Sequence, residues 1–135
     1  MNEPGTALGN YRDKDGNKID SVPDYWVAMH GEFVKEMRAV GFNNIIVCDG
    51  IMTANDHGLY WGHVPDHVVA RSSAIISRGQ DVINWDGQTW ENVMFAFHAY
   101  SQWPSGSLME EYIDSVHARG LAVLIGETGW YLNHG

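Results

Sequence analysis

Two glutamates stand where their carboxylates could do chemistry. Glu127 follows the apolar run 121–125 and Gly126, so its carboxylate emerges from a buried strand beside a residue that lets a ligand approach closely. Such a placement costs free energy unless the charge is paired or used, and a structural pair is the simplest explanation for one carboxylate alone. Glu3, flanked by Asn2 and Pro4, occupies a second such position. Two carboxyl groups about 5 to 5.5 Å apart can hydrolyse a glycosidic bond with retention, and about 6.5 to 9.5 Å apart with inversion.

Three polar side chains could assist these carboxylates. His98 and Tyr100 alternate along one strand and therefore project to the same side of it. Tyr100 could keep a nucleophilic carboxylate ionised by donating a hydrogen bond, and His98 could support a carboxylate or bind sugar. Asn2 could hydrogen-bond a sugar hydroxyl. A lone histidine at a strand end is otherwise a satisfied core residue.

Aromatic residues make up 12% of the chain, and several lie in loop-like stretches. Flat exposed rings suit the faces of sugars, and Trp103 and Trp130 are the candidates we single out for substrate contact. The alternative is that such rings cap the core from its loop side.

Metal sites receive less support from the sequence. His57, His63 and His67 have spacings that fit a zinc site poorly, and no His-Glu-x-x-His motif is present. Residues 13–20 alternate acidic positions around a glycine as a calcium loop does, but a glutamate at the twelfth position is lacking. A solvated Asp-Gly turn explains the same residues. We expect no metal.

The elements that position these residues alternate along the chain. Apolar spacing and turn signals predict helices at 24–40, 66–77 and 107–118, strands at 44–48, 92–97 and 121–125, and a turn-rich connection at 79–90. Strands that are apolar throughout are typical of a parallel sheet covered on both faces. The carboxyl ends of such strands hold the chemistry in barrels and in open doubly wound folds. Those ends carry Glu3, Asp49, His98 with Tyr100, and Glu127.

Composition excludes several classes of function. The 135 residues carry 8 basic and 17 acidic side chains, a net charge of −9 with no basic patch, which argues against nucleic acid and anionic membranes as partners. Cys48 lies in an apolar strand and is the single cysteine, so neither a disulfide framework nor a thiolate zinc site is available. The first residues lack the pattern of a signal peptide.

Three motifs together resemble glycoside hydrolase family 5, and its bacterial β-mannanases and cellulases in particular. They are Asn2-Glu3-Pro4, residues 92–100 ending in His98-Ala99-Tyr100, and residues 123–127 ending in Glu127. The resemblance implies an α/β fold, namely a partial (β/α)8 TIM barrel from about the end of strand 4 through strand 7. It makes Glu3 the acid/base, Glu127 the nucleophile, Asn2 a ligand of the sugar 2-hydroxyl, and His98 and Tyr100 the supporting pair. No cofactor is implied.

The resemblance implies a retaining endo-glycosidase that acts on β-1,4-linked mannan or cellulose. Its early-strand arginine, third-strand histidine and eighth-strand tryptophan have no counterpart in this chain, and a whole barrel takes about 250 residues. We therefore expect residues 1–135 to be a half-barrel fragment that self-associates through open strand edges, from a parent that is secreted. The alternatives are a catalytically impaired carbohydrate-binding barrel fragment and an open doubly wound binding protein, which would lack the usual glycine-rich phosphate loop.

Overall fold

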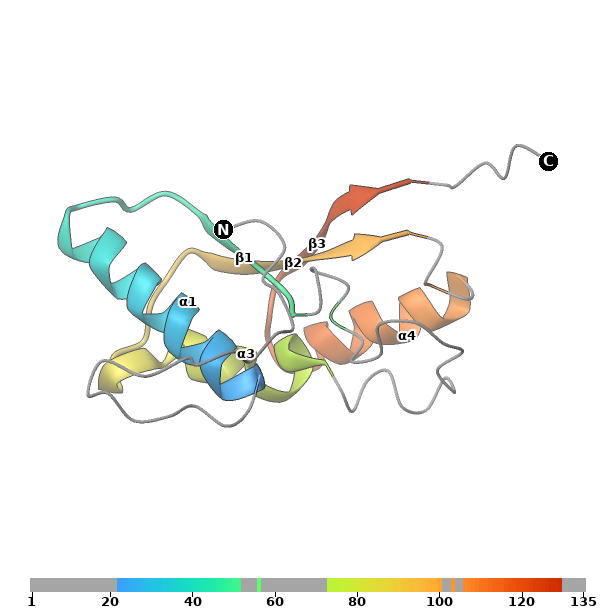
Figure 1. The fold of residues 1–135 in the computed structure, drawn as a ribbon, viewed down its shortest axis with the longest axis horizontal. Helices are drawn as coiled ribbons and strands as arrows, with labels where there is room; N and C mark the ends of the chain where they lie inside the picture. The colour runs from blue at the N-terminus through green and yellow to red at the C-terminus, as the bar shows by residue number, and fades with distance from the viewer. Residues whose placement is uncertain (1–21, 52–55, 57–72, 101–102, 104–105, 130–135) are drawn as a thin grey trace.

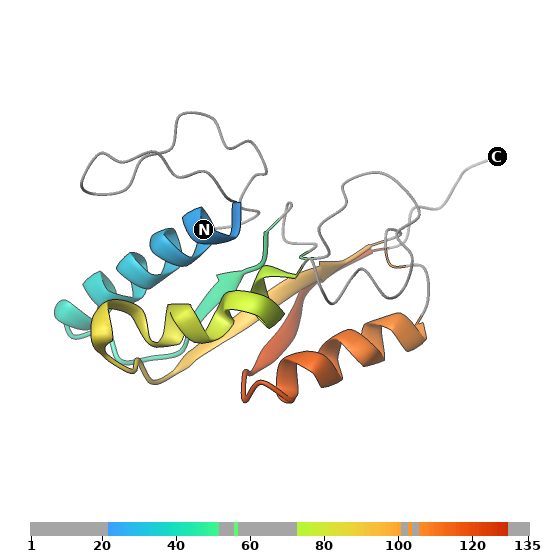
Figure 2. The ribbon, with the colours of Figure 1, turned by 90° about the horizontal axis from the view of Figure 1, so that it is seen from below.

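The computed structural model describes residues 22–51, 56, 73–100, 103 and 106–129. In these ranges helices and strands alternate along the chain: α1 Val22–Ala39, β1 Ile46–Asp49, α3 Ala74–Ile83, the 3-10 turn η1 Trp85–Gly87, β2 Val93–Ala99, α4 Gly106–His117 and β3 Val123–Thr128. The described strands form a parallel sheet in the order β1-β2-β3. Helices α1, α3 and α4 lie side by side along one face of this sheet (Figures 1 and 2).

The core lies between the sheet and the helices. Phe95 and Phe97 on the central strand β2 are fully buried and point toward the helices. The Phe95 ring lies 5.7 Å from the Trp26 ring of α1, and the Phe97 ring lies 4.8 Å from the Tyr112 ring of α4. Because side chains alternate along a strand, His98 points to the face of the sheet opposite the helices.

Glycines end two of the helices directly before a strand. After α1, Gly41 has φ +84°, and the N–H of Phe42 donates to the carbonyl of Met37 over 3.0 Å. After α4, Gly120 has φ +71°, and the N–H of Leu121 donates to the carbonyl of Val116 over 3.3 Å. A left-handed residue with this hydrogen bond is the Schellman ending, which glycine adopts without steric cost. Both endings confirm the helix ends predicted from the sequence.

The middle helix differs from the prediction. Residues 66–72 lie outside the described ranges, and α3 runs on to Ile83 through residues assigned above to a turn-rich connection. The predicted connection begins at Gly79, and glycine usually weakens a helix. Here a Cβ on Gly79 would lie 2.6 Å from the side chain of Leu121 and 3.4 Å from Phe95. Close packing of α3 on the sheet therefore requires glycine within the helix.

The single cysteine lies where the sequence predicts it. Cys48 is a buried residue of β1 and has a free thiol. Burial raises the pKa of this thiol to about 12, so it acts as a core residue and not as a nucleophile. Among the described residues, the helices are too short or too polar to cross a membrane.

Candidate functional site

The carboxyl ends of β2 and β3 bring three of the predicted site residues together. His98 on β2 pairs in register with Glu127 on β3. The hydroxyl of Tyr100 donates a hydrogen bond of 2.7 Å to Oε2 of Glu127. Nδ1 of His98 lies 3.6 Å from the same oxygen, just beyond hydrogen-bond distance. The strand pattern therefore predicted this cluster correctly, although the role of each residue stays a prediction.

A β-bulge sets the position of Glu127. Phe97 pairs with Ile125, but His98 pairs with Glu127, so Gly126 is an extra residue in β3. A bulge bends a strand and redirects the side chains next to it. A Cβ on Gly126 would lie 3.2 Å from Cβ of Ala96 and 3.4 Å from the His98 ring. Glycine therefore leaves room for the imidazole beside the carboxylate.

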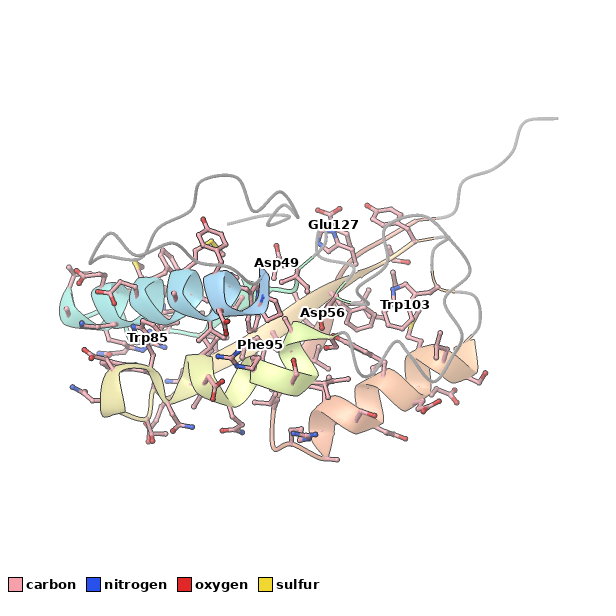
Figure 3. The ribbon with its side chains drawn as sticks, turned by 60° about the horizontal axis from the view of Figure 1, so that its bottom comes forward. Asp49, Asp56, Trp85, Phe95, Trp103 and Glu127 are labelled. Carbon is pink, nitrogen blue, oxygen red and sulfur yellow. The ribbon has the colours of Figure 1, made fainter. Side chains whose placement is uncertain are left out.

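The Glu127 side chain can still meet a ligand. It is 40% exposed, and its contacts with Tyr100 and His98 both use Oε2. No donor among the described residues reaches its other oxygen, Oε1. A carboxylate held by one oxygen and open at the other can attack an electrophilic carbon. Figure 3 shows Glu127 and Asp49 toward the carboxyl ends of the strands, far from Trp85 at the opposite end.

Trp103 holds the end of β2 in place. Its backbone N–H donates to the carbonyl of Tyr100 over 3.1 Å, and its indole Nε1 donates to the carbonyl of His98 over 3.0 Å. On the other strand, Oγ1 of Thr128 donates to the carbonyl of Ala99 over 2.9 Å. These bonds fix the backbone that carries the Glu127 cluster.

Burial gives Trp103 a packing role in the core. The side chain is only 8% exposed, and its ring lies 5.0 Å from the Phe97 ring and 5.1 Å from the Tyr112 ring. Those contacts are core packing, which was the alternative for the loop aromatics. Direct contact between Trp103 and a substrate stays a prediction without support from this geometry.

The other predicted site residues lie outside the described ranges. This applies to Asn2, Glu3 and Trp130, to the histidines at 57, 63 and 67, and to the calcium-like stretch 13–20. The separation of the two carboxylates is therefore not measured, and the pairing of Glu3 with Glu127 stays a prediction. Among the residues that are described, no group of three metal-ligating side chains comes together.

One buried carboxylate, that of Asp56, was not predicted from the sequence. It is fully buried beside the first turn of α3 and accepts hydrogen bonds from Ser73 and Tyr112. Burial raises the pKa of Asp56 to about 6, against the lowering effect of those hydrogen bonds. Its hydroxyl partners are 17 and 56 positions away, so no local pattern indicates them. Ser73 before an apolar run was the available signal, because serine is a preferred N-cap residue.

Comparisons with known proteins agree with the fold and with the motifs. A family model described as cellulase (glycosyl hydrolase family 5) matches residues 1–135. The β-mannanase/endoglucanase A of Caldicellulosiruptor saccharolyticus is 29% identical over 104 residues, which cover 77% of this chain and 7% of that protein.

Two solved structures show the same fold. The catalytic domain of a mannanase from Streptomyces sp. SirexAA-E aligns with a TM-score of 0.62 at 22% identity, over 85% of this chain and 32% of that one. A β-mannanase from Streptomyces thermolilacinus aligns with a TM-score of 0.60 at 20% identity, over 82% of this chain and 32% of that one. The chain thus spans about a third of each, and the predicted partial (β/α)8 barrel is confirmed.

Proposed function

The chain belongs to glycosyl hydrolase family 5, and we propose that it acts as a retaining endo-glycosidase on β-1,4-linked polysaccharide with Glu127 as the nucleophile. The observation that carries the proposal is the oriented carboxylate of Glu127. Tyr100 holds its Oε2 at 2.7 Å, while the side chain stays 40% exposed and Oε1 accepts no hydrogen bond from the described residues. Orientation of a nucleophile before reaction lowers the entropic cost of reaching the transition state.

The proposed mechanism has two displacements. Oε1 of Glu127 attacks the anomeric carbon, and the bond from that carbon to the leaving oxygen breaks as Glu3 gives its proton to that oxygen. Water then attacks the same carbon and loses a proton to Glu3, and the ester bond breaks to release the Glu127 carboxylate. Tyr100 keeps Oε2 in place through both steps. The chemistry needs two carboxyl groups and no cofactor.

The substrate proposed is mannan or cellulose. The names of the similar proteins include mannanase, β-mannanase and endoglucanase. A net charge of −9 suits a neutral polysaccharide better than a polyanion.

Release of reducing ends tests the proposal. The whole chain is incubated with β-mannan and with cellulose, beside Glu127→Gln and the matched control Glu111→Gln, which alters an exposed glutamate on α4. We expect release from at least one polymer, loss of more than about a thousandfold in Glu127→Gln, and no loss in the control. Equal rates for wild type and Glu127→Gln would refute the proposal. Glu3→Gln should slow poor leaving groups more than activated aryl glycosides.

A catalytically impaired carbohydrate-binding protein is the second candidate. The chain aligns with 32% of each solved mannanase, and in such folds residues from several strands contribute to catalysis. Retention of the chain on insoluble mannan or cellulose without release of reducing ends would establish it.

We also propose that copies of the chain associate through their strand edges. In the described sheet, β1 and β3 each pair with β2 alone, and apolar side chains are exposed at Ile45, Val47 and Ile125. Strand edges that no described strand covers favour pairing with another chain. Sedimentation should show species larger than a monomer, and a monodisperse monomer with a sharp thermal transition would contradict the proposal.

A further inference from the structure

The buried carboxylate of Asp56 collects hydrogen bonds from several elements. Its oxygens accept from the backbone N–H groups of Ile51, Ala74 and Ile75 at 3.1 to 3.4 Å, and Oδ2 accepts from the hydroxyls of Ser73 and, over 2.7 Å, Tyr112. Since only a carboxylate offers two acceptor oxygens, no neutral side chain of this size could accept all five. Asp56 therefore joins the segment that follows β1, the start of α3 and the middle of α4.

The Tyr112 side of this cluster leads to the candidate active site. The Tyr112 ring packs against Phe97 and meets the Trp103 ring edge-on, with centroids 5.1 Å apart. Trp103 in turn donates from Nε1 to the carbonyl of His98 and from its backbone to the carbonyl of Tyr100. Both of those residues lie against Glu127. Continuous packing therefore links the Asp56 carboxylate to the Glu127 carboxylate.

The Ser73 side of the cluster leads away from that site. Ser73 caps α3 by accepting from the N–H of Ile76 over 2.9 Å, and its backbone carbonyl accepts from Ser77. These bonds stabilise the start of a helix. Oδ2 of Asp56 thus accepts hydrogen bonds from two hydroxyls. One belongs to Ser73, the cap of α3, and the other to Tyr112, whose ring packs against Phe97 and Trp103.

We propose that Asp56 is a positioning residue for the Glu127 site and acts through Tyr112 and Trp103. Asp56 holds the Tyr112 hydroxyl and thereby fixes the position of the ring that packs against Trp103. Trp103 then holds the backbone at the end of β2 in the position from which Tyr100 bonds Glu127. Burial of a carboxylate costs free energy because the charge loses its water, and the same loss of water raises the pKa of Asp56. A helix cap alone does not require that cost, because serine or asparagine caps a helix equally well.

A matched pair of variants tests the proposal, which rests on the proposed function. Tyr112→Phe and Ser73→Ala each remove one hydroxyl from Oδ2 of Asp56, but only the first lies on the path to Trp103. The measurement is covalent inactivation of the whole chain by an activated 2-deoxy-2-fluoro glycoside, with its rate constant and its binding constant determined separately. We expect Tyr112→Phe to lower the rate constant about tenfold with the binding constant unchanged, and Ser73→Ala to lower stability alone.

A second readout separates failure of this inference from failure of the proposed function. Hydrogen exchange of the Trp103 indole N–H, followed by NMR, reports its bond to the His98 carbonyl without any turnover. We expect faster exchange in Tyr112→Phe and the wild-type rate in Ser73→Ala. Unchanged exchange in Tyr112→Phe, or the same change in both variants, overturns the positioning role even if the wild type is not labelled at all. Labelling of both variants at the wild-type rate overturns it while leaving the proposed function intact.

Discussion

His30 provides a buried group whose protonation can be measured as stability. It lies on α1 with 3% exposure, its ring edge-on to Trp26 at 5.1 Å. Nδ1 lies 3.2 Å from the carbonyl oxygen of Trp26, and because a carbonyl only accepts, Nδ1 carries the hydrogen. Nε2 is buried without a hydrogen-bond partner in the described part of the chain. Burial therefore lowers the pKa of His30 from 6.5 to about 4.

The sign and size of the effect follow from this pKa. Above pH 6.5 the imidazole is neutral in both the folded and the unfolded chain, and its full contribution to stability is present. As the pH falls toward 4, the unfolded chain takes up the proton and the folded chain resists it, so stability is lost. A pKa lowered from 6.5 to about 4 corresponds to about 3 kcal/mol in the free energy of unfolding.

His30→Leu should remove this loss. Leucine fills a similar volume without a polar atom, so we expect its free energy of unfolding to lie within about 1.5 kcal/mol of wild type at pH 7. The difference in free energy of unfolding between the variant and wild type should shift by about 3 kcal/mol in favour of the variant when the pH falls from 7 to 4. Urea unfolding of both proteins at the two pH values, at two protein concentrations to detect association, measures this.

The comparison of variant with wild type cancels the other titrating groups. Asp56 is one of them and acts in the opposite sense, because its pKa is raised from 3.8 to about 6. Its contribution to stability is fully present below pH 3.8 and is lost as the pH rises through about 6. If wild type and His30→Leu change equally in stability between pH 7 and pH 4, burial does not lower the pKa of His30 as described.

Two substitutions near Glu127 test the geometry of the candidate site. Tyr100→Phe removes the 2.7 Å hydrogen bond to Oε2 and should slow labelling of Glu127 by about ten- to a hundredfold, with stability changed by only about 1 kcal/mol; an unchanged labelling rate would contradict the orienting role. Gly126→Ala places a methyl group 3.2 Å from Cβ of Ala96 and 3.4 Å from the His98 ring, so the labelling rate should fall about tenfold and the melting temperature should drop; a variant with wild-type rate and stability would show that the bulge can accept a side chain.

Much of the site framework could be predicted from local sequence. Continuous apolar runs gave the parallel strands, and the alternation of side chains placed His98 and Tyr100 on one side. The carboxyl ends of adjacent parallel strands meet at one edge of a sheet, which is why Glu127 was expected beside them. The predicted helices 24–40 and 107–118 end close to Gly41 and Gly120 for a local reason, since glycine adopts positive φ freely.

The features that were missed depend on contacts between distant parts of the chain. The predicted connection began at Gly79, but the approach of Leu121 decides the place of this glycine within α3. The buried position of Trp103 follows from the rings of Phe97 and Tyr112, and nothing next to it in sequence distinguishes it from an exposed ring. The hydrogen bonds to Asp56 come from distant residues in the same way.

Covalent trapping tests the central claim, that Glu127 is the nucleophile, most directly. The whole chain is treated with activated 2-deoxy-2-fluoro mannosides and glucosides, digested, and analysed by mass spectrometry. We expect one glycosyl adduct, on the Glu127 side chain, that is absent from Glu127→Gln and retained in Glu111→Gln. An adduct on any other residue, or an adduct that persists in Glu127→Gln, would contradict it.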